Sequence, residues 1–405
     1  MIISKKAILN DFIKEVVRLQ ISYDNNPHIF KSKYEQDLEI IKNLSYDVDL
    51  NTFIYLLNRH SLISYFAKSN VLDYVNPKFS SVGKSLFKKE LIHSFKIFQL
   101  TNEINQILKT ENIKFLIIKG APLSLQVFGN LGGRGKSIDV DILIDFKQLI
   151  RIIDILSLKG FKVKRSQIPY LSKSIFGKYC RFIAPELTLY RINNNFLDIV
   201  DLHWRLSWIS DGIPSFDEAY LNRVYLNIDG ISMPTLNHLD TVKHVCNHAA
   251  VENWESIRNL IDIDILIKKT PINQISSLKR NKLIRWSTAV TYKITESDYL
   301  QEYFRGEKNS NILYCLKQAN GQQLLEKKTW GKNGWTIISR LNYLIRFLKL
   351  SESNLEFFRM ILKNFFPPNG FIEPQTNTVL NIVPVIFLRF KKLIYYILIS
   401  IKNNK

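Results

Sequence analysis

Two aspartates stand one residue apart inside an apolar segment of the chain. Asp139 and Asp141 lie in the run IDVDILI, residues 138–144, and on a β-strand this spacing places both side chains on the same face. Neighbouring carboxylates repel each other, so a partly buried pair is usually found together with a cation. No Lys or Arg lies one strand step away on that face, where Ser137 and Leu143 stand. We therefore expect a divalent cation as the counter-charge, and Mg²⁺ prefers such hard oxygen ligands.

Residues that suit a phosphate group precede the aspartate pair. Lys119 and Gly120 end an apolar run, where a glycine lets backbone N–H groups approach a phosphate and the N-terminus of a following helix attracts negative charge. Arg134 lies in the glycine-rich loop before the aspartates, and a guanidinium there can neutralise phosphate oxygens. The alternative for Lys119 is a solvated strand end that binds nothing.

The segment FLDIVDLHW, residues 196–204, adds a third carboxylate on a separate strand. Asp201 is the candidate, and Asp198 competes with it. Their offset of three places them on opposite faces of a regular strand, so only one of them can line the site. His203 shares a face with Asp201 and either contacts a substrate or a metal-bound water, or packs in the protein with both ring nitrogens satisfied. Trp204 is expected in the core.

The hydrophobic periodicity that positions these residues changes twice along the chain. Residues 1 to 110 carry apolar side chains at three- and four-residue intervals, which is typical of helices, with a break expected at residues 76–83 before a long third helix. Helical spacing returns after residue 235. Compact apolar runs between the two helical regions predict strands at residues 113–119, 138–144, 161–165 and 196–204.

The predicted fold class is therefore α+β, with a small mixed β-sheet core flanked by helices. The expected domains are a helical N-terminal region, 1–110, an α/β core, 111–235, and a helical C-terminal region, 236–405. In the central strand, Ile138, Val140 and Ile142 should enter the core. Asp145, at the end of this strand, is expected to cap the helix that begins near Lys147.

The order of these motifs resembles the nucleotidyltransferase superfamily, with its DNA polymerase β-like fold, and more closely a bacterial family of uncharacterised nucleotidyltransferases. The pattern of that family has a Lys-Gly strand end, an Arg before Asp-Ile-Asp, and a later Asp-Leu-His-Trp. The corresponding elements here are Lys119-Gly120, Arg134, Asp139-Val140-Asp141 and Asp201-Leu202-His203-Trp204. The likeness continues into the segment 254–264 and a Phe-Phe-Pro-Pro near the end, and it covers most of the chain.

The resemblance implies in-line attack of an acceptor hydroxyl on the α-phosphorus of a nucleoside triphosphate (NTP). Asp139, Asp141 and Asp201 would hold two Mg²⁺ or Mn²⁺ ions, and these three residues are the predicted catalytic and metal-binding set. Asp201 would either hold the metal on the acceptor side or accept the hydroxyl proton.

The resemblance also implies that Lys119, Gly120, Arg134 and His203 form the nucleotide-binding set. A Gly-Ser or Gly-Gly signature is usual at the strand end of the wider superfamily, whereas this chain displaces Ser124 into the following helix. Triphosphate binding must then rely on backbone N–H groups, Lys119 and Arg134.

Other polar residues have simpler interpretations. His244 and His248 have the i, i+4 spacing of zinc ligands, but no Glu occupies the HExxH position and no third ligand is evident, so helix packing or a contact with the site is expected. Arg258, Asp262 and Asp264 are expected to make ion pairs that join the C-terminal helices to the sheet.

Composition narrows the setting. The chain has 56 Lys and Arg against 36 Asp and Glu, a formal charge of +20, yet no short segment concentrates Arg and aromatics, so a nucleic-acid partner is not expected. Three dispersed cysteines and the lack of a signal peptide indicate a reduced, cytoplasmic setting. Residues 379–401 are the one membrane candidate. Basic residues divide this segment into pieces too short to span, and packing on the protein is favoured over contact with a bilayer surface.

The leading hypothesis is a metal-dependent enzyme that transfers a nucleoside monophosphate to a hydroxyl of a small molecule, peptide or protein in a biosynthetic or defence pathway. The alternative is a catalytically silent fold that binds a nucleotide or a protein. The presence of all three carboxylates favours the enzyme. Nucleotidylation of RNA ranks below both hypotheses because no RNA-binding module is recognisable.

Overall fold

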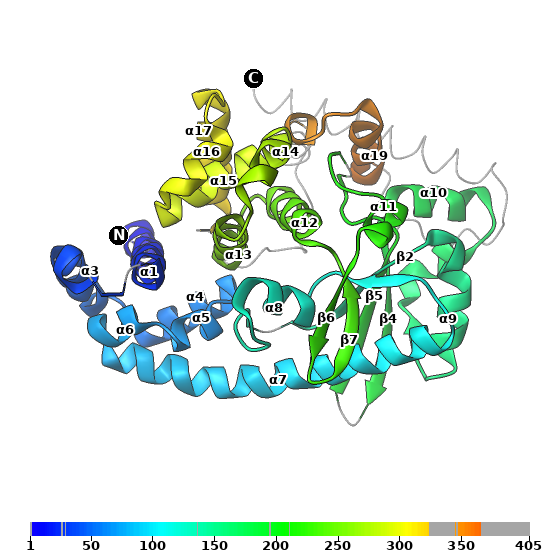
Figure 1. Ribbon diagram of the computed structural model, residues 1–405, viewed down its shortest axis with the longest axis horizontal. Coiled ribbons are helices and arrows are strands. Elements are labelled where there is room, and N and C mark those ends of the chain that lie inside the picture. Colours follow the sequence, from blue (N-terminus) through cyan, green and yellow to red (C-terminus); the bar gives the residue numbers. More distant parts are fainter. Residues whose placement is uncertain are drawn as a thin grey trace, which may run out of the picture. The chain divides into compact units, whose positions relative to one another are not determined.

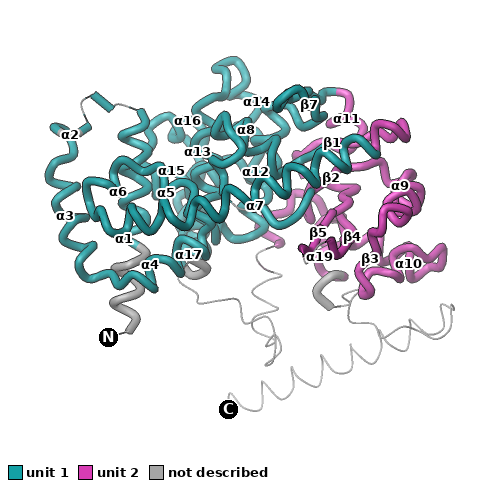
Figure 2. The backbone as a smooth tube through the Cα atoms, turned by 90° about the horizontal axis from the view of Figure 1, so that it is seen from below, with its two compact units in different colours: residues 1–107, 117–140, 222–326 teal, residues 108–116, 141–221, 327–405 magenta. Residues whose placement is uncertain are grey.

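The computed structural model describes residues 2–25, 27–28, 30–135, 137–193, 196–209, 211–323, 345 and 347–365. Contacts divide the chain into two compact units, coloured in Figure 2. The first unit comprises residues 1–107, 117–140 and 222–326, and the second comprises 108–116, 141–221 and 327–405. The sequence-based boundaries at residues 110 and 235 stay a prediction.

The first unit is mainly helical (Figure 1). Its helices are α1 (Ile2–Asn25), α2 (Phe30–Lys33), α3 (Glu35–Tyr46), α4 (Leu50–His60), α5 (Ile63–Ala67), α6 (Asn70–Val75), α7 (Pro77–Thr110), α8 (Ala121–Phe128), α12 (His238–Val251), α13 (Ile257–Lys268), α14 (Ile275–Lys279), α15 (Lys282–Thr295), α16 (Gln301–Phe304) and α17 (Asn309–Gln323). Short 3-10 helices lie at Ile272–Gln274 and Asp298–Leu300.

Helices α12, α13 and α15 pack on one another in this unit, and α1 packs on α15. Trp254 is fully buried among them, and its indole nitrogen donates to the hydroxyl of Ser287 at 2.8 Å. A second apolar centre contains the stacked rings of Phe53 and Phe79, whose centroids lie 4.3 Å apart.

The break expected at residues 76–83 is confined to its first residues: α6 ends at Val75, Asn76 is extended, and α7 begins at Pro77. Pro77 is the first residue of α7, which suits a residue that lacks an N–H group, and the helix continues through Gly83 to Thr110. The expectation that residues 80–83 interrupt the chain is therefore wrong.

A two-stranded hairpin in the first unit was not foreseen. Strands β6 (Val224–Ile228) and β7 (Ile231–Thr235) pair antiparallel, and Asp229 and Gly230 between them have φ values of 50° and 80°. Two successive positive φ values are the hallmark of the type I′ turn that joins two-residue hairpins. The Thr235 hydroxyl donates to the carbonyl of Ile117 at 2.6 Å.

The second unit contains the mixed sheet. Its five strands run in the order β1-β2-β5-β4-β3, with bounds β1 (Phe115–Ile117), β2 (Val140–Ile144), β3 (Lys162–Val163), β4 (Glu186–Asn193) and β5 (Phe196–His203). Its helices are α9 (Leu149–Ser157), α10 (Ile175–Ile183), α11 (Phe216–Leu221) and α19 (Asn354–Phe365), with 3-10 helices at Phe146–Gln148 and Arg165–Leu171. The predicted α+β class with a small mixed sheet is confirmed.

Strand β2 is buried on both faces, as its continuous apolar run predicts. Val140 and Ile142 are buried, but Ile138 precedes the strand and is 55% exposed, so its predicted place in the core is wrong. Asp145 ends the strand, and its carboxylate accepts from the backbone N–H of Lys147 at 2.9 Å, which confirms its predicted capping role.

No helix in the described ranges is both long enough and apolar enough to cross a membrane. The proposed membrane-facing segment 379–401 and the Phe-Phe-Pro-Pro motif from Phe366 onward lie outside the described residues.

Candidate functional site

In the first unit, the turn before α8 exposes backbone of the kind that binds phosphate. Gly120 adopts φ 62° and ψ −128°, a conformation that L side chains rarely adopt, and no side chain caps the helix start there. The first N–H groups of a helix have no intrahelical partner, and Pro122 has no N–H at all. Gly120 and Ala121 line a small pocket, and the half-buried Lys119 directly precedes them.

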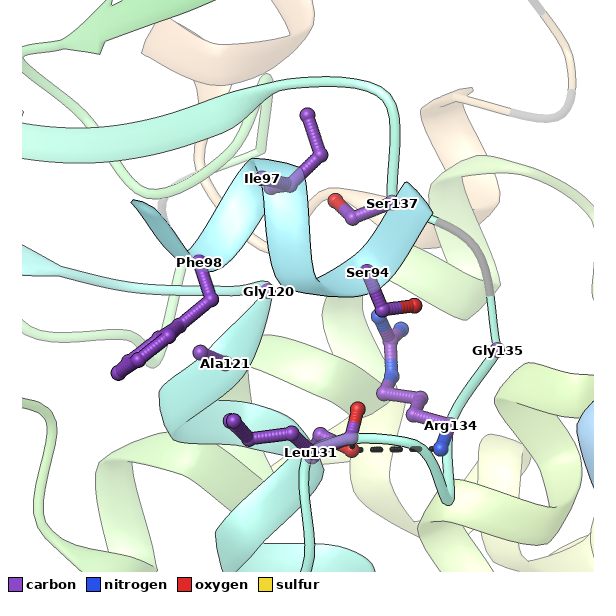
Figure 3. A pocket seen from close by; sticks show the side chains of 10 residues that line it. Ser94, Ile97, Phe98, Gly120, Ala121, Leu131, Arg134, Gly135 and Ser137 are labelled. Carbon is purple, nitrogen blue, oxygen red and sulfur yellow. Dashed lines mark hydrogen bonds between the residues drawn. The ribbon is translucent and has the colours of Figure 1, made fainter. Parts of the chain in front are cut away.

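The loop that follows α8 is held in one conformation by Ser124. Its hydroxyl donates to the carbonyl of Asn130 at 2.7 Å and accepts from the backbone N–H of Arg134 at 3.2 Å, the contact dashed in Figure 3. Gly133 packs so closely on Phe128 that an added Cβ would overlap that side chain. The wider superfamily often has a serine at the strand end. In this chain Ser124 lies within α8 instead, and from there it fixes the conformation of the loop.

Arg134 lines the same pocket, but one edge of its guanidinium is occupied. The residue is 8% exposed, and its Nε donates to Asp262 Oδ2 at 2.7 Å. The prediction that Asp262 ties α13 to the sheet is corrected, because its partner lies in the loop before β2. Among the described residues Asp264 makes no ion pair, and it accepts hydrogen bonds from Tyr299 at 2.6 Å and Thr295 at 2.9 Å.

Asp139 lies at the end of the loop in the first unit, directly before β2. It is partly buried, and the Ser137 hydroxyl donates to its backbone carbonyl at 3.1 Å and approaches its Oδ1 at 3.4 Å. The backbone carbonyl of Ser137 in turn accepts from His93 Nε2 at 2.7 Å. The boundary between the two units falls between Val140 and Asp141.

The second unit gathers three carboxylates and an imidazole. Asp141 is 5% exposed and its Oδ1 lies 2.9 Å from His203 Nε2, while His203 Nδ1 lies 3.2 Å from Glu186 Oε2. Both ring nitrogens of His203 therefore have partners in the second unit, as a packed ring requires. Contact of His203 with an acceptor or a metal-bound water stays a prediction.

Asp201 differs from Asp141, because one of its carboxylate oxygens, Oδ1, contacts no cationic group among the described residues. The pKa of its carboxyl is raised to about 6, chiefly by burial; the charges of Asp141 and Glu186 also raise it, whereas a hydrogen bond from Thr188 and the charge of His203 lower it. Its Oδ1 is buried and has no hydrogen-bond partner among the described residues. A buried acceptor without a partner is costly, so this oxygen is suited to a ligand that is a cation or a donor.

Asp201 lies opposite Thr188 in the register of β4 and β5, and Glu186 lies opposite His203. Glu186 was not among the candidates because β4 has no clear alternation in the sequence, and its place beside His203 follows only from the strand register.

These donors fit a hard divalent cation in chemistry. As the side chains stand, however, no group of three or more His, Cys, Asp or Glu in the described part of the chain lies close enough together to hold a metal ion.

His244 and His248 lie together on α12. Their rings stack with centroids 6.1 Å apart, and His248 Nε2 lies 3.7 Å from Glu252 Oε2. This stacking is compatible with helix packing, and a contact of the pair with the site stays a prediction.

Three features together define a nucleotidyltransferase-like protein. They are a small mixed sheet with helices around it, an uncapped helix start beside an arginine, and an Asp-x-Asp at the head of a central strand. Residues 46–296 match a family described as "Uncharacterised nucleotidyltransferase", which is more than half of the chain. The chain belongs to this family, whose activity class is nucleotidyl transfer. No curated protein matches it.

Proposed function

We propose that the protein is a metal-dependent nucleotidyltransferase that moves a nucleoside monophosphate from an NTP to a hydroxyl of a small molecule, peptide or protein. The observation that carries the proposal is Asp201: a partly buried carboxylate, near the negative charges of Asp141 and Glu186, with one buried oxygen that no described residue satisfies. Such a cluster costs folding free energy unless a cation or a reacting proton uses it.

Asp139, Asp141 and Asp201 would hold Mg²⁺ or Mn²⁺, as the family resemblance implies. When bound, the ions would supply charge neutralisation at the triphosphate and lower the pKa of the acceptor hydroxyl. In the reaction, the acceptor oxygen forms a bond to the α-phosphorus, the bond from that phosphorus to the bridging oxygen breaks, and pyrophosphate leaves.

Asp201 is also the best placed group to take the proton of the acceptor hydroxyl. A general base works best when its pKa lies near the working pH, and a carboxyl with a pKa of about 6 is closer to neutrality than an exposed aspartate. His203, which contacts Asp141 and Glu186, would set the position of both carboxylates.

The phosphate end of the substrate would lie at the start of α8. Gly120 leaves its backbone open, Arg134 provides charge, and Lys119 is the neighbouring cation along the chain. These groups together can neutralise a triphosphate without the serine that the wider superfamily uses.

The second candidate is a catalytically silent fold that binds a nucleotide or a protein. It is favoured by one observation, that the described side chains do not form a metal cluster as they stand. A silent protein would bind an NTP without transferring any part of it.

A cytoplasmic setting and a peptide or small-molecule acceptor remain part of the first proposal, and RNA ranks below them as an acceptor.

Transfer of an α-³²P label separates the candidates. The full chain would be incubated with Mg²⁺ or Mn²⁺, each labelled NTP in turn, and a cell lysate as the source of acceptors. We expect label on an acceptor with the wild type and loss of at least 100-fold with Asp139→Asn or Asp141→Asn. Equal labelling by folded variants and wild type would show that the aspartate pair does not hold the metal.

A further inference from the structure

The pocket of the first unit lies between α7, the start of α8 and the loop before β2 (Figure 3). Ser94, Gly120, Ala121, Arg134 and Ser137 are among its lining residues. Arg134 is the one cationic side chain among the residues that line it in the described chain. Its orientation therefore decides whether the pocket can recognise an anion.

The guanidinium of Arg134 is anchored from behind. Its Nε donates to Asp262 Oδ2 at 2.7 Å, and the structure shows no hydrogen bond from Nη1 or Nη2 to any described residue. In Figure 3 the guanidinium extends towards Ser94, on the side of the pocket. An arginine with its Nε edge fixed still offers two terminal N–H groups in the fork geometry that matches two phosphate oxygens.

Stability alone does not account for Asp262. The residue is fully buried on α13, and its Oδ1 has no hydrogen-bond partner in the described part of the chain. A buried ion pair is often no more stable than apolar side chains of the same volume, because both charges lose water. What the pair does provide is a single orientation for Arg134.

We propose that Asp262 is a positioning residue for the triphosphate: it fixes Arg134 through Nε so that the two terminal nitrogens meet phosphate oxygens in the pocket. This inference rests on the proposed function. It assigns a part in substrate binding to α13, because Asp262 on this helix lies 128 residues beyond Arg134 in the chain.

A matched control stands two residues away on the same helix. Asp264 is 2% exposed, accepts from Thr295 and Tyr299, and does not line the pocket. Its replacement by Asn removes a buried carboxylate of the same element without touching Arg134.

Isothermal titration of the full chain with inorganic tripolyphosphate tests the proposal, because this probe has no base or sugar. We expect Asp262→Asn to raise the dissociation constant at least about tenfold, and Asp264→Asn to leave it within about twofold. Arg134→Lys should weaken binding similarly, because lysine keeps the charge but has no second edge for Asp262 to hold. In the Arg134→Lys background, Asp262→Asn should have no further effect.

Two results would overturn the role of Asp262. One is wild-type affinity in folded Asp262→Asn; the other is an equal loss from this substitution with and without Arg134, which would indicate a general effect on the fold. Arg258 also lies near Asp262. The Asp262→Asn variant therefore leaves two buried guanidiniums, those of Arg134 and Arg258, without the negative charge of Asp262, and this loss can prevent folding. If Asp262→Asn does not fold, unchanged affinity in Arg134→Lys overturns the proposal. A wild type that binds neither tripolyphosphate nor any NTP contradicts the proposed function itself.

Discussion

Arg191 and Asp198 face each other across strands β4 and β5, and the guanidinium holds the carboxylate by two nitrogens. Arg191 Nη2 and Nε lie 2.8 Å and 3.0 Å from Asp198 Oδ2, and the same guanidinium stacks over the ring of Phe161. Asp198 is thus committed to an ion pair. Because side chains alternate along a strand, Asp201 projects to the other face. Of these two carboxylates, Asp201 is the one with an oxygen that no described residue satisfies.

This relationship supplies a matched pair of variants. Asp198→Asn should lower the free energy of unfolding by about 1 kcal/mol, because it breaks a largely buried ion pair, and should leave nucleotidyl transfer within about threefold of wild type. Asp201→Asn should lower transfer by at least about 100-fold. Initial rates of α-³²P transfer and urea unfolding of both variants check this, and equal loss of activity in the two would remove Asp201 from the site.

Asp201 should also cost the protein stability at neutral pH. Its pKa is raised to about 6 in the folded protein, above the usual value near 3.8, so the folded state binds a proton more readily than the unfolded state between these pH values. The wild type should therefore lose stability relative to Asp201→Asn as the pH rises from 4 to 7. The difference at pH 7 should be about 1 to 2 kcal/mol in favour of the variant.

Urea unfolding at pH 4, 5, 6 and 7 measures this difference. A variant that is no more stable than wild type at any pH would mean that Asp201 carries no strained negative charge in the folded protein.

Ser124 should matter for ligand binding through the loop that it closes. Ser124→Ala removes the hydroxyl that donates to Asn130 and accepts from the N–H of Arg134, and leaves a buried N–H without its partner. We expect a loss of about 1 to 2 kcal/mol in unfolding free energy and weaker tripolyphosphate binding. Thermal unfolding and titration report the two effects separately; unaltered binding by a destabilised variant would show that the loop does not form the anion site.

His60 should make stability fall in acid. It is fully buried at the end of α4, and burial, with the charges of Arg59 and Lys14, lowers its pKa to about 3, whereas the unfolded chain has the ordinary value near 6.5. The unfolded state then binds more protons between pH 6.5 and 3, so stability is complete above this window and decreases as the pH falls through it.

His60→Leu has no ring to titrate and is the comparison for this effect. Its stability should fall less steeply than that of wild type, by about 1 kcal/mol per pH unit between pH 6 and 4, as read from urea midpoints. Parallel pH profiles of the two proteins would contradict the account of this buried imidazole.

The sequence predicted those parts of the molecule that depend on local pattern. The buried strand β2, the cap at Asp145, the helices after residue 235, and the opposite faces of Asp198 and Asp201 all follow from the local sequence. The hairpin of β6 and β7 had a local signal too, because Asp229-Gly230 favours a type I′ turn, and this signal was not used.

Other features have no local signal. Glu186 reaches His203 only through the pairing of β4 with β5, and β4 alternates too weakly to be recognised as a strand. Arg134 and Asp262 are 128 residues apart, and only the packing of α13 brings them together. Ser124 could be placed on a helix, but its bond to a loop ten residues later depends on how that loop turns.

Binding of NTPs to the full chain tests the central claim most directly. Isothermal titration with ATP, CTP, GTP and UTP, each with and without Mg²⁺, would be carried out on the wild type, on Asp139→Asn/Asp141→Asn and on the control Asp198→Asn. The account predicts binding of at least one NTP that depends on Mg²⁺, is weakened at least about tenfold in the double variant and is retained in the control. A folded wild-type protein that binds none of the four NTPs with Mg²⁺ would contradict it.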